Sequence, residues 1–193
     1  MDKLRYVTEP LAITHHPASA VQGMRTELID VHKDARAELL DQPFYSAERF
    51  WERFENYITA PDFQLVVGRI ENLIVGYTFG SPLPADTKWW QHLQGSDDPD
   101  LTRETGHRTF AFREILVRKQ FQRRGIAHRL HDALLQGRTE ERAALLVRSD
   151  NPAGELYRRW GWCQIGFLQP YPDSPRFEAM IIDLHSRFST AKD

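Results

Sequence analysis

The sequence predicts a single α/β domain that spans residues 1–193. Short, nearly continuous apolar runs at 110–117 and 143–147 are typical of buried strands, and they alternate with segments of helical periodicity. A chain of 193 residues with 41% hydrophobic content is long enough to bury a full core in one domain. The sequence contains no internal repeat and no low-complexity tract that would indicate a different architecture.

Charge and composition argue against several classes of protein. The net charge is −2, so the basic residues are balanced by acids and a nucleic-acid partner is not expected. There is no apolar run long enough to span a bilayer and no signal-peptide core within Met1–Pro10, so we expect no membrane partner. The single cysteine, Cys163, excludes an internal disulfide framework and fits a cytoplasmic protein. Because Cys163 lies in a predicted strand, we expect a buried structural thiol.

The first third of the chain predicts a short strand and two helices. The strand is expected at Leu4–Thr8. A helix capped by Ser19 follows, because its apolar residues recur at spacings of three and four: Val21, Met24, Leu28, Val31 and Ala35. A second helix begins at Ser46, carries several aromatic residues and ends before Pro61.

Residues 63–70 and 73–79 are β-rich segments joined at Glu71-Asn72, and they predict a hairpin. The sequence then changes character over residues 81–108, where proline, glycine and acidic residues are frequent. A connection of this length inside a compact domain is usually functional or disordered. The pair Trp89-Trp90 favours order, because large apolar rings seldom stay in solvent. We interpret residues 81–108 as a cover over a substrate site, with a disordered surface excursion as the alternative.

The stretch 110–137 organises the rest of the chain and predicts a strand, a basic turn and a helix. The turn is Gln122–Ala127, and the helix after it shows a helical period that Gly137 ends. Small residues let the backbone approach a ligand, and the first helical turn offers unpaired N–H groups to an anion. The turn lacks the Gly-Lys-Ser/Thr of a Walker A loop and the three glycines of a dinucleotide fingerprint. It therefore predicts an anion site of another kind.

The last third of the chain predicts a strand at 142–148 and then a short helix. Asn151 is a good N-cap for this helix, Pro152 suits its first position, and Gly161 ends it. Tyr157 lies on one face of the helix, near its end. The remaining segments predict a final pair of strands and a frayed tail: 162–168, 176–184 and 186–193.

Two motifs in these stretches resemble those of the GNAT superfamily of N-acetyltransferases. Gln122, Gly125 and Ala127 occupy the defining positions of the family's Gln-x-x-Gly-x-Ala acyl-CoA loop. Asn151 and Tyr157, with Gly-Trp following, resemble the family's second signature. The resemblance implies an α/β fold (α+β in some schemes) with a mixed central sheet of about six or seven strands flanked by about four helices.

The resemblance also implies that acetyl-CoA is the acyl donor. The residues expected to bind it are Ile115, Leu116, Val117, Gln122, Arg123, Arg124, Gly125, Ile126, Ala127, Asn151 and Tyr157. In the family a tyrosine at this position faces the thiol of CoA, so Tyr157 is the expected general acid for the departing thiolate. A backbone N–H of Leu116 or Val117 is expected to polarise the acetyl oxygen.

An amine acceptor needs a base, because an amine with a pKa of ~10.4 is almost fully protonated at neutral pH. Glu114 stands just before the pantetheine-binding stretch and is the expected base. The alternative for Glu114 is a structural ion pair, and Glu104, Asp183 or a chain of waters remain other possible bases.

The expected function is direct transfer of the acetyl group of acetyl-CoA to a primary amine of a small molecule or peptide. Such transfer needs no metal, and His128 and His131 share a helix face without an evident third ligand. The alternatives are a non-catalytic acetyl-CoA sensor or interaction module on the same fold, or a protein that binds ATP or NAD. The sequence leaves the identity of the amine open and allows a homodimer.

Overall fold

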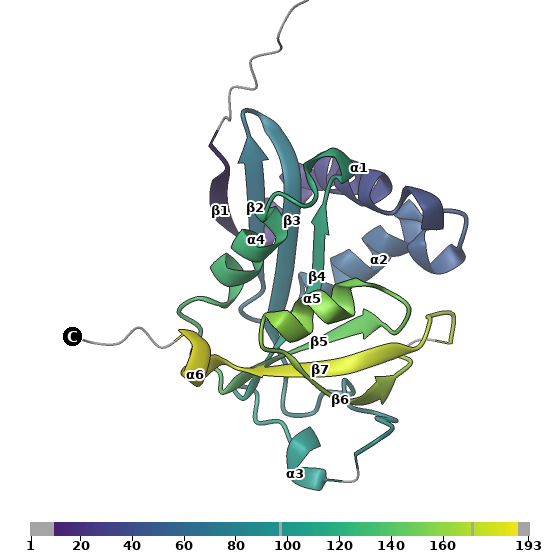
Figure 1. Cartoon of the computed structure of the whole chain (residues 1–193), viewed down its shortest axis with the longest axis vertical. Coiled ribbons are helices and arrows are strands. Elements are labelled where there is room, and N and C mark those ends of the chain that lie inside the picture. Colours follow the sequence, from purple (N-terminus) through teal and green to yellow (C-terminus); the bar gives the residue numbers. More distant parts are fainter. Residues whose placement is uncertain (1–9, 97, 171, 189–193) are drawn as a thin grey trace, which may run out of the picture.

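The computed structural model describes residues 10–96, 98–170 and 172–188 (Figure 1). Its centre is a seven-stranded mixed sheet in the order β1-β2-β3-β4-β5-β7-β6. The strands are β1 (Ala12–Pro17), β2 (Gln64–Ile70), β3 (Leu73–Pro82), β4 (Thr109–Val117), β5 (Arg142–Arg148), β6 (Cys163–Leu168) and β7 (Phe177–Asp183). The α/β class and the expected number of strands are confirmed.

The helices of the described residues are α1 (Arg25–Ala35), α2 (Ala47–Tyr57), α3 (Pro99–Thr102), α4 (Ile126–Leu135), α5 (Ala153–Arg159) and α6 (Leu184–Phe188). The short helices α3 and α6 are additional to the four expected. Helix α2 begins as predicted, because the Ser46 hydroxyl accepts the N–H of Arg49 at 3.2 Å. The helix expected from Ser19 begins later, after two 3₁₀ turns at 18–20 and 22–24.

The sheet is antiparallel except between β4 and β5, and this parallel pair is short. Residues 109–111 pair with residues 142–144, and the register ends there. Beyond Ala111 the two strands part (Figure 1), while β4 continues to pair with β3 and β5 with β7. The sheet therefore consists of two halves, β1–β4 and β5–β7, which are joined at one end and open at the other.

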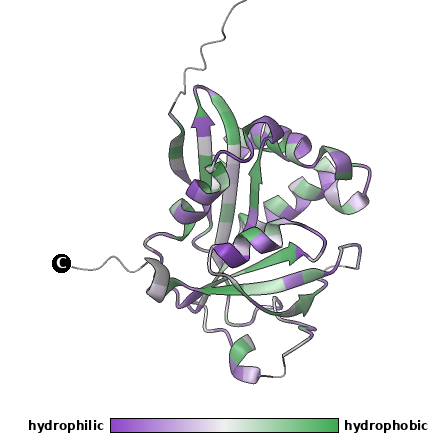
Figure 2. Cartoon of the chain, in the orientation of Figure 1, coloured by the Kyte–Doolittle hydropathy of each residue, from purple (hydrophilic) through white to green (hydrophobic). Residues whose placement is uncertain are grey.

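Alternation along the strands sends side chains to both faces of the sheet, and each face has its own hydrophobic cluster. In β2, Val66 packs in the cluster of α4 and α5, whereas Leu65 and Val67 pack in the cluster of α1 and α2. The apolar strands in the interior and the mixed surfaces of the helices are visible in Figure 2. The half made of β1–β4 is thus covered by helices on both faces.

The segment 83–96 covers the face of β5–β7 that lies opposite α5. Leu83 and Trp90 are buried there with alanines and Leu168. Gln94 also exchanges backbone hydrogen bonds with Phe167 of β6, at 3.0 and 2.9 Å. This part of the connection 81–108 is therefore a packed layer of the domain, and the alternative of a surface excursion is wrong for it.

A buried polar network fixes the end of the same connection. Glu104 Oε1 accepts hydrogen bonds from the Trp90 indole (2.8 Å), the Thr109 hydroxyl (2.8 Å) and the Arg142 guanidinium (3.1 Å). Arg142 also donates to the carbonyl of Leu101 at 2.6 Å. The network joins the connection to the shared end of β4 and β5. Glu104 is thereby a structural residue, and it does not line the cleft described below.

Several smaller expectations need correction or fall outside the described residues. Cys163 is exposed, because it begins the edge strand β6, so the prediction of a buried thiol is wrong. The strand expected at Leu4–Thr8 and the tail at 189–193 lie outside the described residues, and 184–188 form α6. None of the helices in the described part of the chain is long and apolar enough to cross a bilayer.

Candidate active site

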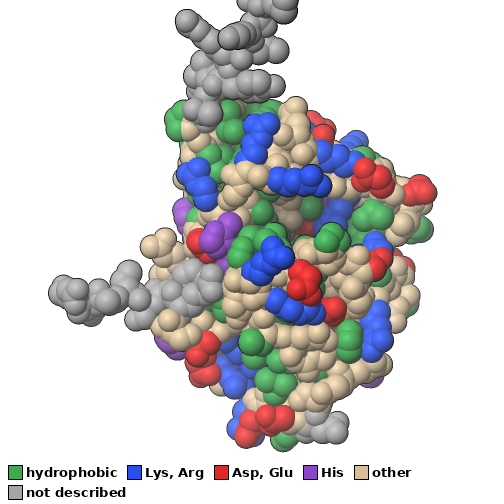
Figure 3. Space-filling view, viewed as in Figure 1, with side chains coloured by type: hydrophobic (Ala, Val, Ile, Leu, Met, Phe, Trp, Pro, Cys, Tyr) green, Lys and Arg blue, Asp and Glu red, His purple; other side chains and the backbone are tan. Residues whose placement is uncertain are grey.

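A cleft of about 1170 Å³ lies where the two halves of the sheet part. Its walls come from β4, β5, the loop before α4 and the start of α5. Its other end is closed by α2, by residues 87–92 of the connection and by residues 169–170. Lys and Arg side chains gather on the face of the molecule where the loop into α4 reaches the surface (Figure 3). Residues of both sequence motifs, the Gln122–Ala127 turn and the Asn151–Tyr157 segment, line this cleft.

The loop before α4 has the backbone of an anion site. Gly125 is the N-cap residue of α4, with a φ of 74° and no side-chain cap, and Arg123 has a φ of 60°. A Cβ at Gly125 would meet nothing within 4 Å, and Gly125, Ile126 and Ala127 line the cleft, so the start of α4 borders open space. Gln122 donates from Nε2 to the carbonyl of Val117 at 3.0 Å and ties the loop to the end of β4. These features fit the pyrophosphate of an acyl-CoA.

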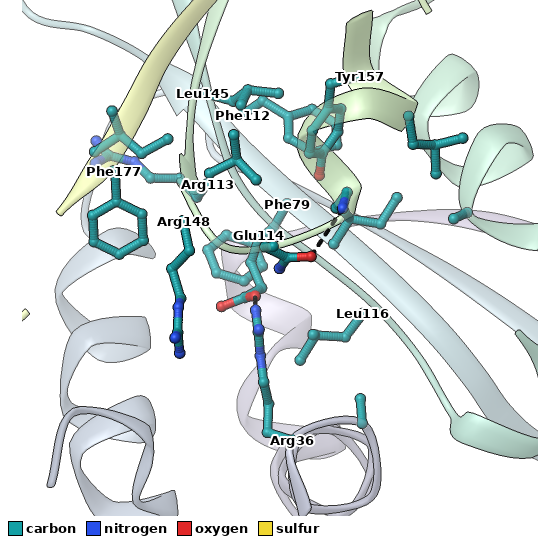
Figure 4. Close-up of a pocket in the computed structure, with 18 of the residues that line it drawn as sticks. Arg36, Phe79, Phe112, Arg113, Glu114, Leu116, Leu145, Arg148, Tyr157 and Phe177 are labelled. Atoms are coloured by element: carbon teal, nitrogen blue, oxygen red, sulfur yellow. Dashed lines mark hydrogen bonds and ion pairs between the residues drawn. The ribbon is translucent and has the colours of Figure 1, made fainter. Parts of the chain in front are cut away.

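Asn151 and Gly161 set the two ends of α5. The Asn151 Oδ1 accepts the N–H of Ala153 at 2.9 Å, and Gly161 turns the chain with a φ of 90°. Between these ends, the ring of Tyr157 packs against Phe112, Trp160 and other aromatic residues. The Tyr157 side chain is thereby fixed with its hydroxyl directed into the cleft (Figure 4).

Burial dominates the electrostatics of Tyr157. Loss of solvent around the phenol, and to a smaller extent the negative charge of Glu114, raises the pKa of Tyr157 above the usual value for tyrosine. A raised pKa keeps the hydroxyl protonated over the whole range in which most enzymes work. Tyr157 can therefore donate a proton or a hydrogen bond at neutral pH.

Glu114 reaches the cleft from an irregular part of β4. The pairing of β3 with β4 shifts between Phe79 and Gly80, which leaves Arg113 as an extra residue in β4 and lets two consecutive side chains reach the cleft. Glu114 Oε1 accepts from Arg36 Nη2 at 2.8 Å, and the two side chains are 19% and 21% exposed (Figure 4). The ion pair anticipated as an alternative for Glu114 is present, and its partner is Arg36, at the end of α1.

Aromatic and basic side chains form the end of the cleft remote from the loop before α4. The guanidinium of Arg113 lies between the rings of Tyr57 and Trp89, at 4.6 and 4.8 Å from their centroids. Further rings line the same end: Phe44, Tyr45, Phe79 and Phe177. The sequence indicated aromatic residues in α2, but it gave no signal that Arg113 or Arg36 would meet them.

Every residue predicted for the site lines the cleft except Arg124. The Arg124 guanidinium instead lies 5.4 Å from the ring of Phe121. Asp183, considered as a possible base, is not among the lining residues either, since it ends β7 on the surface. The catalytic and binding roles of the lining residues stay predictions.

One group of potential metal ligands occurs among the described residues: His128, His131 and Asp132 in α4. His131 Nε2 accepts the indole N–H of Trp162 at 2.9 Å, and Nδ1 lies 2.8 Å from the Asp132 carboxylate. With one ring nitrogen accepting and the other donating, His131 has no lone pair left for a metal. The group is a polar network that connects α4 to Trp162, the residue just before β6.

Comparisons with solved structures identify the fold. The protein PH1933 of Pyrococcus horikoshii OT3 superimposes with a TM-score of 0.64 and 21% identity, covering 89% of this chain and 98% of that one. Ard1 of Thermoplasma volcanium gives a TM-score of 0.59 and 17% identity, covering 90% and 97%. The PaiA N-acetyltransferase of Thermoplasma acidophilum, in complex with coenzyme A, gives 0.51 and 11%, covering 90% and 99%. No curated protein sequence matches the chain.

A family model described as the acetyltransferase (GNAT) domain matches residues 103–170, which contain both motifs and most of the cleft-lining strands. Together with the fold, this match places the protein among the acyltransferases. The resemblance to the GNAT superfamily is thus supported by the family match over residues 103–170 and by the likeness of the fold.

Proposed function

We propose that the protein is an N-acetyltransferase that moves the acetyl group of acetyl-CoA directly to a primary amine of a small molecule or peptide. One observation carries the proposal: a single cleft joins the open N-terminus of α4 to Glu114 on one wall and Tyr157 on the other. The acyl donor supplies an activated thioester. The chain has to bind it, deprotonate the amine and protonate the sulfur that leaves.

Glu114 is the proposed base. Arg36 engages Oε1, and Oε2 has no hydrogen-bond partner among the described residues, so Oε2 faces the cleft as a proton acceptor. The Thr78 hydroxyl donates to the carbonyl of Glu114 at 2.8 Å and fixes the backbone there. The base accepts the proton directly from the ammonium or through one water.

Tyr157 is the proposed acid, since its hydroxyl is protonated and directed into the cleft. The bond between the carbonyl carbon and sulfur breaks as the amine nitrogen bonds to that carbon, and the phenol protonates the sulfur. Leu116 or Val117 offers the backbone N–H for the carbonyl oxygen, because β4 has no partner strand on its β5 side beyond Ala111.

A screen of primary amines with acetyl-CoA and detection of free thiol tests the proposal. We expect thiol release that depends on the amine and is lost in Gly125→Asp, whose carboxylate would occupy the space expected for the pyrophosphate. Binding of acetyl-CoA without thiol release from any amine would favour the non-catalytic sensor. A thermal shift with ATP or NAD but none with CoA would favour a nucleotide-binding protein.

A further inference from the structure

Tyr157 is carried by a helix that has little packing of its own. Of the seven residues of α5, Gly154 and Tyr157 are buried, and Leu156 is an exposed apolar side chain. A short helix with few buried contacts opens readily unless its ends are held. Asn151 caps the N-terminal end. The contacts of the C-terminal end are therefore important for keeping the Tyr157 hydroxyl in the cleft.

Trp162 closes the C-terminal end of α5. Its backbone N–H donates to the carbonyl of Tyr157 at 3.0 Å, and the N–H of Gly161 donates to the carbonyl of Arg158 at 3.0 Å. With Gly161 in the left-handed region (φ 90°), this is the Schellman arrangement that commonly ends a helix. The indole of Trp162 also packs edge to face with the ring of Tyr157, at 6.1 Å between centroids. Trp162 thus contacts Tyr157 through both its backbone and its side chain.

The indole of Trp162 is held in turn by His131 of α4. An indole N–H can only donate, so the His131 Nε2 atom that lies 2.9 Å from it must carry a lone pair. The proton of the neutral imidazole is then on Nδ1, which donates to Asp132 at 2.8 Å, and this second bond fixes the tautomer. His131 is 0% exposed and Trp162 is 2% exposed. Loss of the His131–Trp162 bond would therefore leave a buried donor unsatisfied.

The His131–Trp162 bond connects the two halves of the sheet. Helix α4 packs on β2, β3 and β4, whereas α5 packs on β5 (Figure 1). The N-terminus of α4 is the proposed site of the pyrophosphate, and α5 carries the proposed acid. The bond therefore fixes the helix that presents the acid relative to the helix that binds the acyl donor.

We propose that His131 is a positioning residue for Tyr157: by accepting the indole N–H of Trp162, it keeps the phenol at the place where the sulfur leaves. His131 and Trp162 are not among the described residues that line the cleft, so His131 acts through Tyr157 and not on the substrate. The inference rests on the proposed function and adds to it a residue remote from the reacting atoms.

Single-turnover acetyl transfer tests the inference. His131→Leu removes the acceptor and should slow transfer by about tenfold to a hundredfold, because a misplacement of about 1 Å can cost that much. The amide oxygen of His131→Gln can accept the same N–H and should restore most of the rate. Leu130→Ala is the matched control, because Leu130 is buried in the same helix but lies against Gly68 of β2 and Gly76 of β3. It should lower the Tm and keep the parental rate. A parental rate in His131→Leu, or an equal loss in Leu130→Ala, overturns the inference.

A double-mutant cycle with Tyr157→Phe distinguishes positioning from general loosening of the fold. If His131 acts through the hydroxyl, His131→Leu should have no further effect, within about twofold, once the hydroxyl is absent. Loss of the same factor in both backgrounds overturns the inference. If His131→Leu does not fold, Trp162→Phe removes the same bond from the other side and keeps an aromatic ring. It then takes the place of His131→Leu with the same expectations.

Tyrosine NMR in the presence of CoA measures the position of Tyr157 without turnover. The chain has six tyrosines, and the ring signals that disappear in Tyr157→Phe would assign Tyr157. These signals should shift or broaden in His131→Leu and return in His131→Gln. If they do so and no amine is acetylated, the positioning role stands and the proposed function falls. Unshifted signals in a His131→Leu variant of a protein that transfers acetyl groups overturn the inference and leave the proposed function intact.

Discussion

The surroundings of Tyr157 allow a direct test of its proposed role as the general acid. Its ring is held by aromatic neighbours, so replacement by phenylalanine removes the hydroxyl and little else. If the hydroxyl protonates the departing sulfur, single-turnover acetyl transfer by Tyr157→Phe should be slower by about a hundredfold or more. The affinity for acetyl-CoA should change little, because the thiolate forms only late in the reaction. Transfer at the rate of the parent protein would end the assignment.

The pH dependence gives an independent check on Tyr157. Burial and the charge of Glu114 raise the pKa of Tyr157, so the acid form persists as the pH rises. A general acid must be protonated to act. Because the pKa of Tyr157 is raised, its hydroxyl should stay protonated up to about pH 10, near the usual tyrosine pKa, and the rate should not fall through loss of this proton. Single-turnover rates of the parent protein from pH 7 to pH 10 should therefore show no decrease that is missing in Tyr157→Phe. An alkaline fall absent from Tyr157→Phe would contradict the raised pKa.

Glu114 is either a general base or only the structural ion-pair partner of Arg36, and a pair of variants distinguishes these two roles. As a base, Glu114→Gln should lower kcat/KM by roughly a hundred- to ten-thousand-fold, with the largest loss at low pH, where the amine is hardest to deprotonate. Arg36→Gln keeps the carboxylate and should be far more active. A purely structural pair predicts instead that both variants lose similar stability and that neither loses more than about threefold in rate. Urea denaturation and steady-state kinetics of both variants decide between the readings.

At this scale the sequence was informative where a residue's role is local. Gln122, Gly125 and Asn151 act on backbone within a few positions of themselves, and the structure gives each a local contact or conformation of the expected kind. Arg36 is different, since its partner Glu114 lies 78 residues away. Nothing in the residues around Arg36 indicates that α1 ends beside β4.

The connection 81–108 has two structural roles, because it forms a packed layer on the sheet and also a wall of the cleft. Each of its two adjacent tryptophans takes part in one of these roles. Trp90 is buried with Leu83 against the strands β5–β7 and donates to Glu104, whereas Trp89 is half-buried and faces Arg113 in the cleft. Shortening the whole connection would therefore damage the core as well as any cover.

The tryptophan pair tests the two tasks separately. Trp90→Ala should lower the free energy of unfolding by about 3–5 kcal/mol, as for other buried aromatic residues cut to alanine. Trp89→Ala should cost about 1 kcal/mol or less and raise the acceptor KM severalfold, with acetyl-CoA affinity unchanged. Urea denaturation and acceptor kinetics of both variants provide the measurement. Normal kinetics in Trp89→Ala would mean that the connection covers the sheet but not the acceptor.

Most strands and the long helices were predictable because each carries its own period, whereas β1 (Ala12–Pro17) was not predicted. Continuous apolar runs mark β4 and β5, and Ser46 and Asn151 mark helix starts. The layer formed by residues 83–96 has no such period. Its buried residues are scattered among prolines and acids, and their partners in β4, β5 and β7 are distant in sequence. The sequence therefore favoured order only through the bulk of two tryptophans.

For the whole molecule, the consequential feature is the short junction between the halves of the sheet. Three paired positions of β4 and β5, together with the network of Glu104 and Arg142, hold the halves at one end. The cleft lies at the other end, where neither strand completes its hydrogen bonds with the other. Periodicity predicts each strand but not where two neighbours cease to pair, so this feature was not predictable from the sequence.

A ligand that spans the open end should stabilise both halves at once. At a free CoA concentration of about 100 times Kd, binding adds about 2.7 kcal/mol to the free energy of unfolding. For a domain of this size that corresponds to a rise in Tm of roughly 5–10 °C. Hydrogen exchange should slow in β4 and in β5 beyond residue 144, as well as in the first turn of α4. Protection confined to α4 would mean that CoA binds only at the helix and does not join the halves.

Gly125→Asp is the matched control, because a side chain at this position meets no protein atom within 4 Å and so spares the core. The φ of 74° makes any side chain there mildly unfavourable, so the variant itself should melt slightly lower than the parent. Its carboxylate would repel the pyrophosphate at the N-terminus of α4, and CoA should then neither raise the Tm nor slow exchange in β5. If CoA stabilised Gly125→Asp as much as the parent, the pyrophosphate would have to bind elsewhere. The α4 loop would then not contribute to the stabilisation of the two halves by CoA.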